Sequence, residues 1–297
     1  MSAVEEHLAT RNAAGLFDFS FMALYEFQGR PQLQALQTRD LEPLAPGQIA
    51  YTLLLKDDGA VLIDATVWRL DAERFWLFTG KRVPVQALER SGEHAILALQ
   101  GPASGAILAR LIGREAVLGL RYFRFIEKDS LIIGRLGFSG ELGYELLVDP
   151  AEASGVRTTL LEAGSAEGLR ECGWVAANSL RIEAGYVLFD REIDGRANPR
   201  ELGLERLVDG RRRRFEVSRQ LVGLEILEPE AAPLDLPAAA ATSECFSPAL
   251  GKTIALGFAD PDCTSGSAVR LGDGRFARVA QLPFHDPERR RPRDAPL

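Results

Sequence analysis

The sequence predicts an α+β protein, in which hairpins and helices mix over the first two thirds and short strands alone form the last third. Up to about residue 206, strand-like and helix-like runs follow one another without the regular repetition of a parallel βαβ series. Beyond that point the apolar runs are short and are separated by turns rich in proline and alanine, which is typical of a small all-β module. We therefore expect two domains, residues 1–206 and residues 207–297.

Several strands are expected in the first hundred residues, because apolar residues there alternate with polar ones or form short β-branched runs. The strand segments are 21–29, 47–55, 59–70, 74–80 and 95–102. The sequence KDDG joins the second segment to the third and predicts a hairpin. Residues 31–41 have helical spacing, and Pro31 suits the first turn of a helix.

The second hundred residues are expected to be richer in helix. Residues 103–113 and 153–168 have helical spacing, and a third, amphipathic helix begins within residues 176–189. Residues 130–149 hold two strand patterns around a glycine-rich turn.

The C-terminal third is expected to contain strands and turns but no helix. Its strand segments are 220–227, 253–260, 267–272 and 276–284. Residues 228–243 are rich in proline and alanine and are expected to form a loop. The polar tail, residues 285–297, is expected to fray.

Composition excludes several classes of protein. The 297 residues are 46% hydrophobic and 26% charged, so the chain can bury a sizeable core. A net charge of −7 argues against a general nucleic-acid binder. The three cysteines and three histidines show no metal-ligand spacing, so no metal site is expected. The three cysteines also form a poor disulfide framework. Neither a signal pattern nor an apolar run of eighteen residues occurs, so we expect a cytoplasmic protein without a membrane partner.

The motifs of several familiar enzyme classes are missing from the sequence. It has no G-x-S-x-G elbow, no Walker A loop and no H-E-x-x-H helix. The glycines of GRLGFSG lie between two strands and not at a strand-to-helix turn, which indicates a hairpin turn rather than a dinucleotide site.

Asp64 stands in the middle of an apolar strand. Alternation places Leu62, Thr66 and Trp68 on the same face as its carboxyl group. Two interpretations are open. Asp64 is either a solvated or backbone-bonded residue at a sheet edge, or a carboxylate in a partly apolar pocket that is tuned for proton transfer or cation stabilisation.

Glu145, in a later strand, raises the same question. It is either a charge at the rim or a group that binds an amidine-like edge, such as an aminopyrimidine, through two hydrogen bonds. The four arginines at 211–214 form either a solvated turn or a site that attracts a polyanionic tail.

Six blocks of sequence, spread from about residue 9 to residue 285, occur in the order of one known family. They read AGLFDFSFMALYEFQG, PGQIAYTLLLKDDGAVLIDATVWRL, ALQGPAS, GFSGELGYELLVDP, SLRIEAGYVLFDREID and TSECFSPALGKTIALGFAD followed by VAQLPF. Together they resemble the glycine-cleavage T-protein (aminomethyltransferase) family. The resemblance implies a three-lobed cloverleaf around a central folate channel, with two intertwined α+β lobes and a small C-terminal lobe like a β-barrel.

The resemblance also implies chemistry and site residues. The family transfers a one-carbon unit from an amine, or in some branches a methyl group from oxygen or sulfur, to tetrahydrofolate. Asp64 matches the essential aspartate, which is implied to stabilise or deprotonate the developing cationic centre. Glu145 matches the glutamate that holds the aminopyrimidine edge of the pterin. The other cofactor-binding positions fall on Met22, Tyr51, Gly80 and Phe138.

Four positions depart from the glycine-cleavage pattern. An aspartate, an asparagine, a tyrosine and an arginine of that pattern are replaced by Ile63, Gly80, Phe138 and Ala177. The departures indicate a divergent member, closer to the folate domains of dimethylglycine and sarcosine dehydrogenases or to stand-alone folate-dependent demethylases. Loss of the arginine at Ala177 is expected to weaken the binding of the folate glutamate by about 1–3 kcal/mol.

We therefore expect a tetrahydrofolate-dependent aminomethyltransferase or demethylase. Its donor is expected to be a small methylated amine, or a methyl ether or thioether. Two alternatives stay open. One is a folate-binding assembly or regulatory protein without catalytic activity, and the other is a folate subunit beside a separate flavin oxidoreductase.

Overall fold

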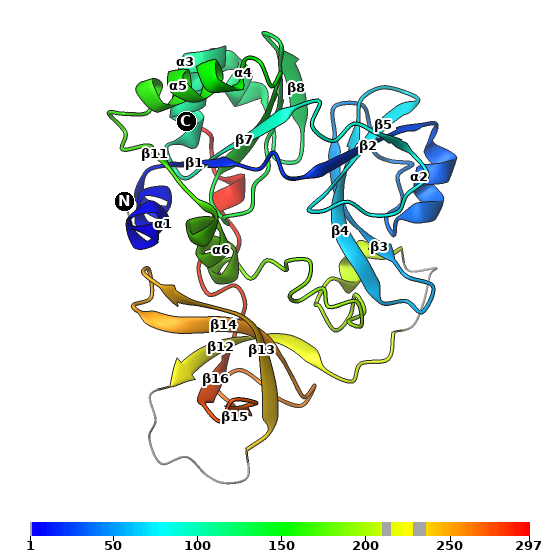
Figure 1. Cartoon of the computed structure of the whole chain (residues 1–297), viewed down its shortest axis with the longest axis vertical. Helices are drawn as coiled ribbons and strands as arrows, with labels where there is room; N and C mark the ends of the chain where they lie inside the picture. The colour runs from blue at the N-terminus through cyan, green and yellow to red at the C-terminus, as the bar shows by residue number, and fades with distance from the viewer. Residues whose placement is uncertain (1, 210–214, 228–235) are drawn as a thin grey trace.

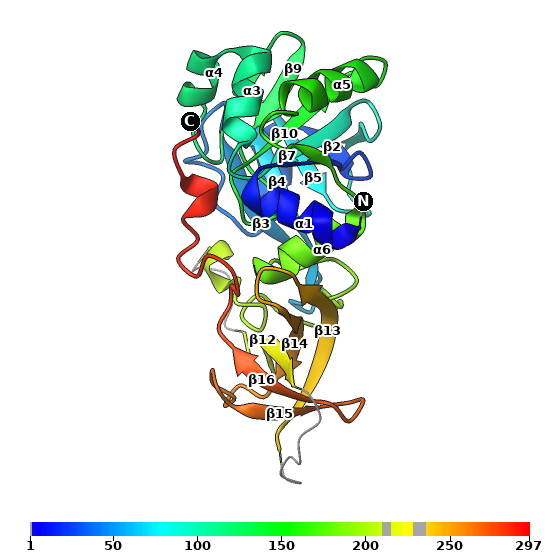
Figure 2. The same cartoon turned by 90° about the vertical axis from the view of Figure 1, so that its left-hand side faces the viewer.

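The computed structural model describes residues 2–209, 215–227 and 236–297. The chain forms three lobes, each built on its own sheet, around the centre of the molecule (Figure 1). Seen from the side, the all-β lobe lies at one end and the two mixed lobes at the other (Figure 2). The arrangement confirms the expected α+β class with an all-β C-terminal lobe.

The first lobe is a six-stranded sheet covered on one face by helices. In sheet order its strands are β11 (Arg170–Glu171), β1 (Gly15–Asp18), β7 (Ala95–Gln100), β10 (Gly143–Val148), β9 (Leu131–Gly134) and β8 (Phe125–Lys128). The covering helices are α3 (Ser104–Ile112), α4 (Arg114–Gly119) and α5 (Ala153–Ala163). Tyr144, Leu146 and Val148 of β10 pack with these helices in one core. By alternation, Glu145 and Leu147 face the opposite side of the sheet, toward the second lobe.

The second lobe is a five-stranded antiparallel sheet with one helix. Its order is β3 (Ile49–Leu55), β4 (Val61–Arg69), β5 (Arg74–Thr79), β2 (Ala23–Gln28) and β6 (Leu88–Glu89), and its helix is α2 (Arg30–Leu36). Ile63, Ala65 and Val67 of β4 pack in a core beside α2. Asp64 and Trp68 therefore face the other way, and Trp68 joins the core between the two lobes. The predicted face is confirmed for Asp64, Thr66 and Trp68 but is wrong for Leu62. A β-bulge interrupts the pairing of β3 with β4 at that residue, and Leu62 packs against the same core as Ile63.

The chain crosses between these two lobes twice. It leaves the first lobe after β1, forms β2 to β6 in the second lobe, and returns at β7. The two lobes are therefore intertwined, as the resemblance implied.

The third lobe is a closed five-stranded barrel. Its order is β12 (Gln220–Leu227), β14 (Lys252–Ala259), β13 (Ala238–Ser247), β15 (Ala268–Leu271) and β16 (Phe276–Ala280). The loop expected over 228–243 is wrong for its second half, because Ala238 and the residues after it pair with β14 and β15. Small alanines can form a strand when both neighbours supply a ladder, which composition alone does not reveal. Residues 228–235 lie outside the described residues.

The segment that follows residue 184 packs between the second lobe and the barrel. It contains the 3₁₀ helix η1 (Glu205–Leu207), and Leu207 packs with Leu53 of β3 and Phe258 of β14. The division between residues 206 and 207 stays a prediction.

The N-terminal helix α1 (Ala3–Asn12) was not predicted. It starts with a capping box of Ser2 and Glu5, and its buried residues are polar rather than apolar. Arg11 Nη1 lies 2.8 Å from Glu141 Oε1, and Arg11 Nε lies 2.9 Å from Glu183 Oε2 in α6 (Trp174–Glu183). Because buried ion pairs hold α1 in place, it lacks the apolar stripe that marks an amphipathic helix.

The C-terminal tail is ordered, so the expectation that it frays is wrong. It forms the 3₁₀ helix η2 (Arg291–Arg293), in which Pro292 is buried. Arg291 Nη1 lies 3.0 Å from Glu141 Oε1, which ties the tail to the first lobe. Within the described ranges, no helix is long and apolar enough to cross a membrane, and no cluster of His, Cys, Asp or Glu fits a metal ion.

Candidate active site

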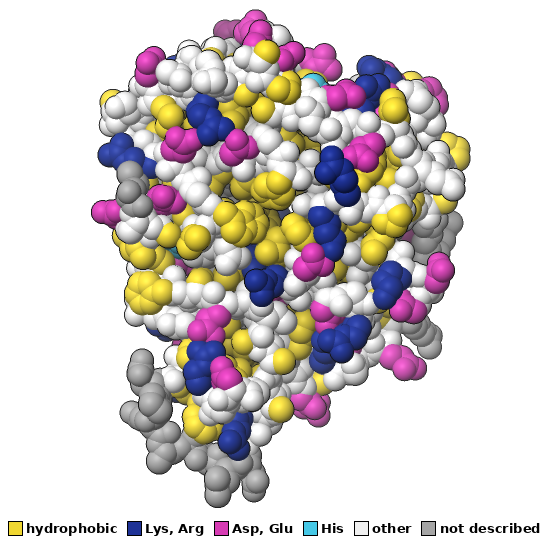
Figure 3. All heavy atoms as spheres, in the orientation of Figure 1, with side chains coloured by type: hydrophobic (Ala, Val, Ile, Leu, Met, Phe, Trp, Pro, Cys, Tyr) yellow, Lys and Arg dark blue, Asp and Glu magenta, His cyan; other side chains and the backbone are white. Residues whose placement is uncertain are grey.

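One large cavity lies where the three lobes meet. Its volume is about 770 Å³, and its walls come from both mixed lobes, the segment after α6 and the C-terminal tail. Hydrophobic side chains gather at the centre of the molecular face shown in Figure 3. All residues to which the sequence gave a site role line this cavity: Met22, Tyr51, Asp64, Gly80, Phe138 and Glu145. The fold therefore brings the predicted positions into one site.

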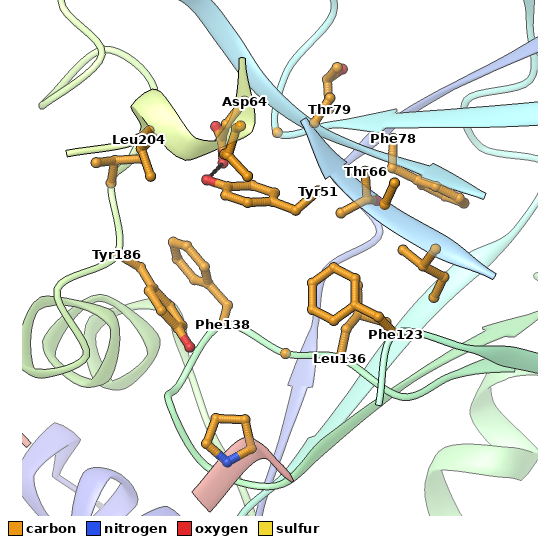
Figure 4. Close-up of a pocket in the computed structure, with 18 of the residues that line it drawn as sticks. Tyr51, Asp64, Thr66, Phe78, Thr79, Phe123, Leu136, Phe138, Tyr186 and Leu204 are labelled. Carbon is orange, nitrogen blue, oxygen red and sulfur yellow. Dashed lines mark hydrogen bonds between the residues drawn. The ribbon is translucent and has the colours of Figure 1, made fainter. Parts of the chain in front are cut away.

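Asp64 and Tyr51 form a hydrogen-bonded pair at one end of the cavity. Tyr51 Oη donates to Asp64 Oδ2 at 2.9 Å, from β3 to the neighbouring β4 (Figure 4). Burial raises the pKa of Asp64 to about 6, although the Tyr51 hydrogen bond opposes the rise. Burial also raises the pKa of Tyr51 well above its usual value, so Tyr51 is the donor of this bond. Of the two interpretations of Asp64, the geometry supports the partly apolar pocket.

Glu145 is a buried carboxyl group that also reaches this cavity. It is 8% exposed, and burial raises its pKa to about 7. Its side chain has no hydrogen-bond partner among the described residues, although buried carboxylates normally have one. The group is therefore available to a ligand with two neighbouring N–H donors.

Aromatic rings form part of the wall of the same cavity. The rings of Phe138 and Tyr186 are stacked at an interplanar angle of 29°, with centroids 6.1 Å apart. Figure 4 shows Phe123 and Leu136 on the neighbouring wall. Stacked, apolar walls suit a flat heterocycle.

Among the described residues, four arginines belong to the lining and bring positive charge to the cavity: Arg39, Arg206, Arg289 and Arg293. Two of them come from the tail. Arg289 Cζ lies 5.9 Å from the ring centre of Tyr186, and Arg293 Cζ lies 5.7 Å from that of Tyr122. These cations suit the carboxylates of a ligand. The arginines at 211–214 lie outside the described residues.

The four departures from the glycine-cleavage pattern divide into two pairs. Gly80 and Phe138 line the cavity, whereas Ile63 is buried beside α2 and Ala177 is buried in the core between the lobes. The alanine at 177 therefore fills a core position and leaves no gap in the cavity wall.

Sequence reasoning missed several residues of the lining, chiefly Tyr186, Phe189, Leu204, Arg289 and Arg293. Tyr186 directly follows the helix block SLRIEAG, so its position in a matched block was an available signal. The many arginines of the tail were a second signal for cavity residues. That signal was missed because the tail was expected to fray.

Comparisons with known proteins agree with this fold and site. The family model described as the GCVT N-terminal domain matches residues 1–212. The chain is 33% identical to an aminomethyltransferase of Symbiobacterium thermophilum, over 98% of this chain and 91% of the relative. It is 31% identical to an aminomethyltransferase of Halothermothrix orenii, over 95% of this chain and 91% of the relative. The crystal structure of glycine cleavage system aminomethyltransferase T from Bartonella henselae superposes with a TM-score of 0.79, at 25% identity, over 95% of this chain and 89% of that one.

The fold and the cavity thus define a one-carbon transferase that uses tetrahydrofolate as acceptor. The chain belongs to the GCVT (aminomethyltransferase) family.

Proposed function

We propose that the one-carbon donor is a small amine that carries a methyl group on nitrogen. The observation that supports this donor is the Asp64–Tyr51 pair, a single carboxylate with one hydrogen-bonded phenol at an otherwise apolar end of the cavity. Such an end accepts a compact cation with apolar substituents better than a donor with many hydrogen-bonding groups.

The residues present fit tetrahydrofolate. Glu145 would hold the aminopyrimidine edge, since its carboxyl group lies in the cavity without a partner among the described residues. Phe138 and Tyr186 would flank the ring system, and Arg289 with Arg293 would meet the glutamate carboxylates. When bound, tetrahydrofolate supplies the nucleophilic nitrogen that accepts the carbon.

The transfer balances without an oxidant when the carbon is a methyl group. The bond between the amine nitrogen and the carbon breaks, and the amine keeps the electron pair. A bond from the carbon to the acceptor nitrogen forms, and the proton lost from that nitrogen leaves on the amine. Methyl transfer therefore changes no oxidation state.

Asp64 faces the positive charge of the donor nitrogen during this step. Its pKa of about 6 leaves it mostly ionised at neutral pH, yet basic enough to receive a proton. Tyr51 fixes one carboxylate oxygen, and the other has no hydrogen bond to another described residue. A fixed negative charge lowers the barrier without reorganisation where positive charge develops as the carbon moves, and it can receive the proton that the accepting nitrogen loses.

The test is transfer of ¹³C from N-methyl-labelled amines to tetrahydrofolate, followed by ¹³C NMR. We expect label in the folate with the wild type and none with Asp64→Asn. Label that appears equally with both proteins would overturn the role of Asp64. Folate binding without any transfer would favour a folate-binding protein without catalytic activity.

The same spectrum distinguishes the two products. A labelled methyl carbon on the folate agrees with direct methyl transfer. A labelled methylene carbon instead requires a donor that has already been oxidised to an imine. In that case a flavin oxidoreductase is the proposed partner, and co-purification from cells tests it.

A further inference from the structure

Gly80 lies beside Asp64 at the apolar end of the cavity. It directly follows Thr79, the last residue of β5, and Thr79 pairs with Ala65 of β4. Opposed residues of an antiparallel pair share a face of the sheet. One step beyond that last pair, residue 80 stands next to Asp64. A side chain at position 80 would therefore point into the cavity beside the carboxylate.

Phe189 occupies the space that such a side chain would fill. A Cβ atom added to Gly80 would lie 2.3 Å from Phe189 Cε1 and 2.5 Å from Phe189 Cδ1, closer than real contacts allow. The ring of Phe189 can lie at this position only because Gly80 has no side chain. The edge of the ring fills the space that a side chain of residue 80 would take.

Several contacts hold this ring in place, and one of them is its packing against the buried core that contains Ile63 and Ala65. Lys81 Nζ lies 5.7 Å from the centre of the Phe189 ring and forms an ion pair with Asp190. The backbone of Phe189 also forms an isolated bridge with Ile193. The ring is therefore a fixed part of the wall.

The remaining wall at this end is largely apolar. Val187, Leu188 and Leu207 belong to it. Leu204, which Figure 4 labels, packs like Tyr51 against the cluster of Val187 and Leu207. The side chain of Arg206 also contributes to the lining, but Arg206 is exposed. Thr79 also belongs to the lining, but its hydroxyl donates to the backbone oxygen of Lys81 at 2.7 Å. The Asp64–Tyr51 pair thus supplies the buried polar groups for a donor nitrogen.

We infer that Phe189, seated against Gly80, determines donor specificity by selecting amines whose nitrogen carries methyl groups over primary amines. This inference rests on the proposed function and names its specificity residue. A primary ammonium has three N–H donors, and an N–H left without an acceptor in an apolar site is costly. Each methyl group removes one such donor and gains contact with the ring edge.

The first experiment measures the binding of three amines that differ only in N-methylation: glycine, N-methylglycine and N,N-dimethylglycine. The wild type, saturated with tetrahydrofolate, is expected to bind the dimethylated amine about tenfold more tightly than glycine, as two buried methyl groups would give. Phe189→Ala is expected to reduce that ratio to near one, and Phe189→Leu to keep most of it.

A second variant removes the contact but keeps the ring. Gly80→Ala introduces the clashing Cβ, so the ring must move and the methyl preference should fall. Phe246→Leu is the matched control, because it removes an exposed ring that is not part of the lining, and it should leave the ratio of amine affinities unchanged. Tetrahydrofolate affinity, measured for each variant, reports whether the protein is folded.

The outcomes separate the two proposals. A wild type that binds none of the three amines overturns the proposed donor class and this inference with it. A wild type that prefers the dimethylated amine, together with Phe189→Ala and Gly80→Ala proteins that keep the same ratio, overturns the inference and leaves the proposed function in place.

Discussion

The phenol of Tyr51 donates a hydrogen bond of 2.9 Å to the carboxylate of Asp64, across two neighbouring strands of the second lobe. This bond fixes one oxygen of a carboxylate whose pKa burial raises to about 6. The pair is the polar centre of the apolar end of the cavity.

Replacing Asp64 with asparagine removes the negative charge but keeps the shape. We expect kcat to fall by about 10²–10³-fold, the usual effect of losing one preorganised electrostatic group. Tetrahydrofolate affinity should stay nearly constant, because Glu145 lies on the other lobe. Steady-state kinetics with calorimetry checks both values, and a parallel loss of folate affinity would place Asp64 in folate binding instead.

Activity should rise with pH through the pKa of Asp64, because the ionised carboxylate is the active form. The wild-type profile of kcat/KM is expected to have an acid limb near pH 6. Tyr51→Phe removes the hydrogen bond that lowers this pKa, so its acid limb should move to higher pH. A limb that stays in place would show that the bond does not tune Asp64.

Glu145 should reduce stability at neutral pH. Its folded-state pKa of about 7 lies above the ordinary value of 4.5, so the folded protein binds the extra proton between these two values. The contribution of Glu145 to the free energy of unfolding is therefore fully present below about pH 4.5 and is lost as the pH rises to about 7. Without ligand, Glu145→Gln should raise the free energy of unfolding by about 3 kcal/mol at pH 8 and little at pH 4.

The control for that measurement is Glu141→Gln. Burial raises the pKa of Glu141, but hydrogen bonds from His285 and Arg11 outweigh this and lower it overall. Its loss should therefore destabilise the protein at neutral pH and less so in acid, the opposite sign. Urea unfolding at the two pH values checks both variants, and equal signs would refute the assignment.

Two tail arginines should bind the anionic end of folate. Arg289→Ala and Arg293→Ala together are expected to weaken tetrahydrofolate binding by about tenfold and to reduce its dependence on salt. Arg290→Ala is the matched control, since Arg290 pairs with the exposed Glu288. Titrations at two salt concentrations decide the point, and equal effects of all three substitutions would argue for a general charge effect.

Arg11 should be essential for docking α1. Arg11→Met removes the cation that Glu141 and Glu183 share, which is expected to cost about 3 kcal/mol, because Glu141 keeps Arg291 as a partner. Arg157, which forms partly exposed pairs with Asp18 and Glu171, provides the comparison, and Arg157→Met should cost at most about 1 kcal/mol. Urea unfolding of both variants tests the difference, and similar losses would contradict it.

The periodicity of apolar residues predicted those strand faces that depend on the local sequence. The alternation around Asp64 gave its face correctly, because one side of β4 packs on α2 and the other on the first lobe. It failed for α1, which is held by ion pairs, and for β13, whose alanines form a strand only between two partners. Such elements depend on tertiary contacts.

The residues of the candidate site also divide into those that the sequence located and those that it missed. Family blocks located both carboxyl groups, since motif positions are local in sequence. The contact of Phe189 with Gly80 joins segments more than a hundred residues apart, and no local pattern carries it. The tail arginines were missed because a polar, proline-rich end resembles a frayed one.

Calorimetric titration of tetrahydrofolate into the wild type and Glu145→Gln tests most directly whether this cavity is the folate site. We predict saturable binding at one site in the wild type, weakened at least about tenfold by the substitution, because the carboxylate loses a charge-assisted pair of hydrogen bonds. Equal affinity in the two proteins, or no saturable binding to the wild type, would contradict the account.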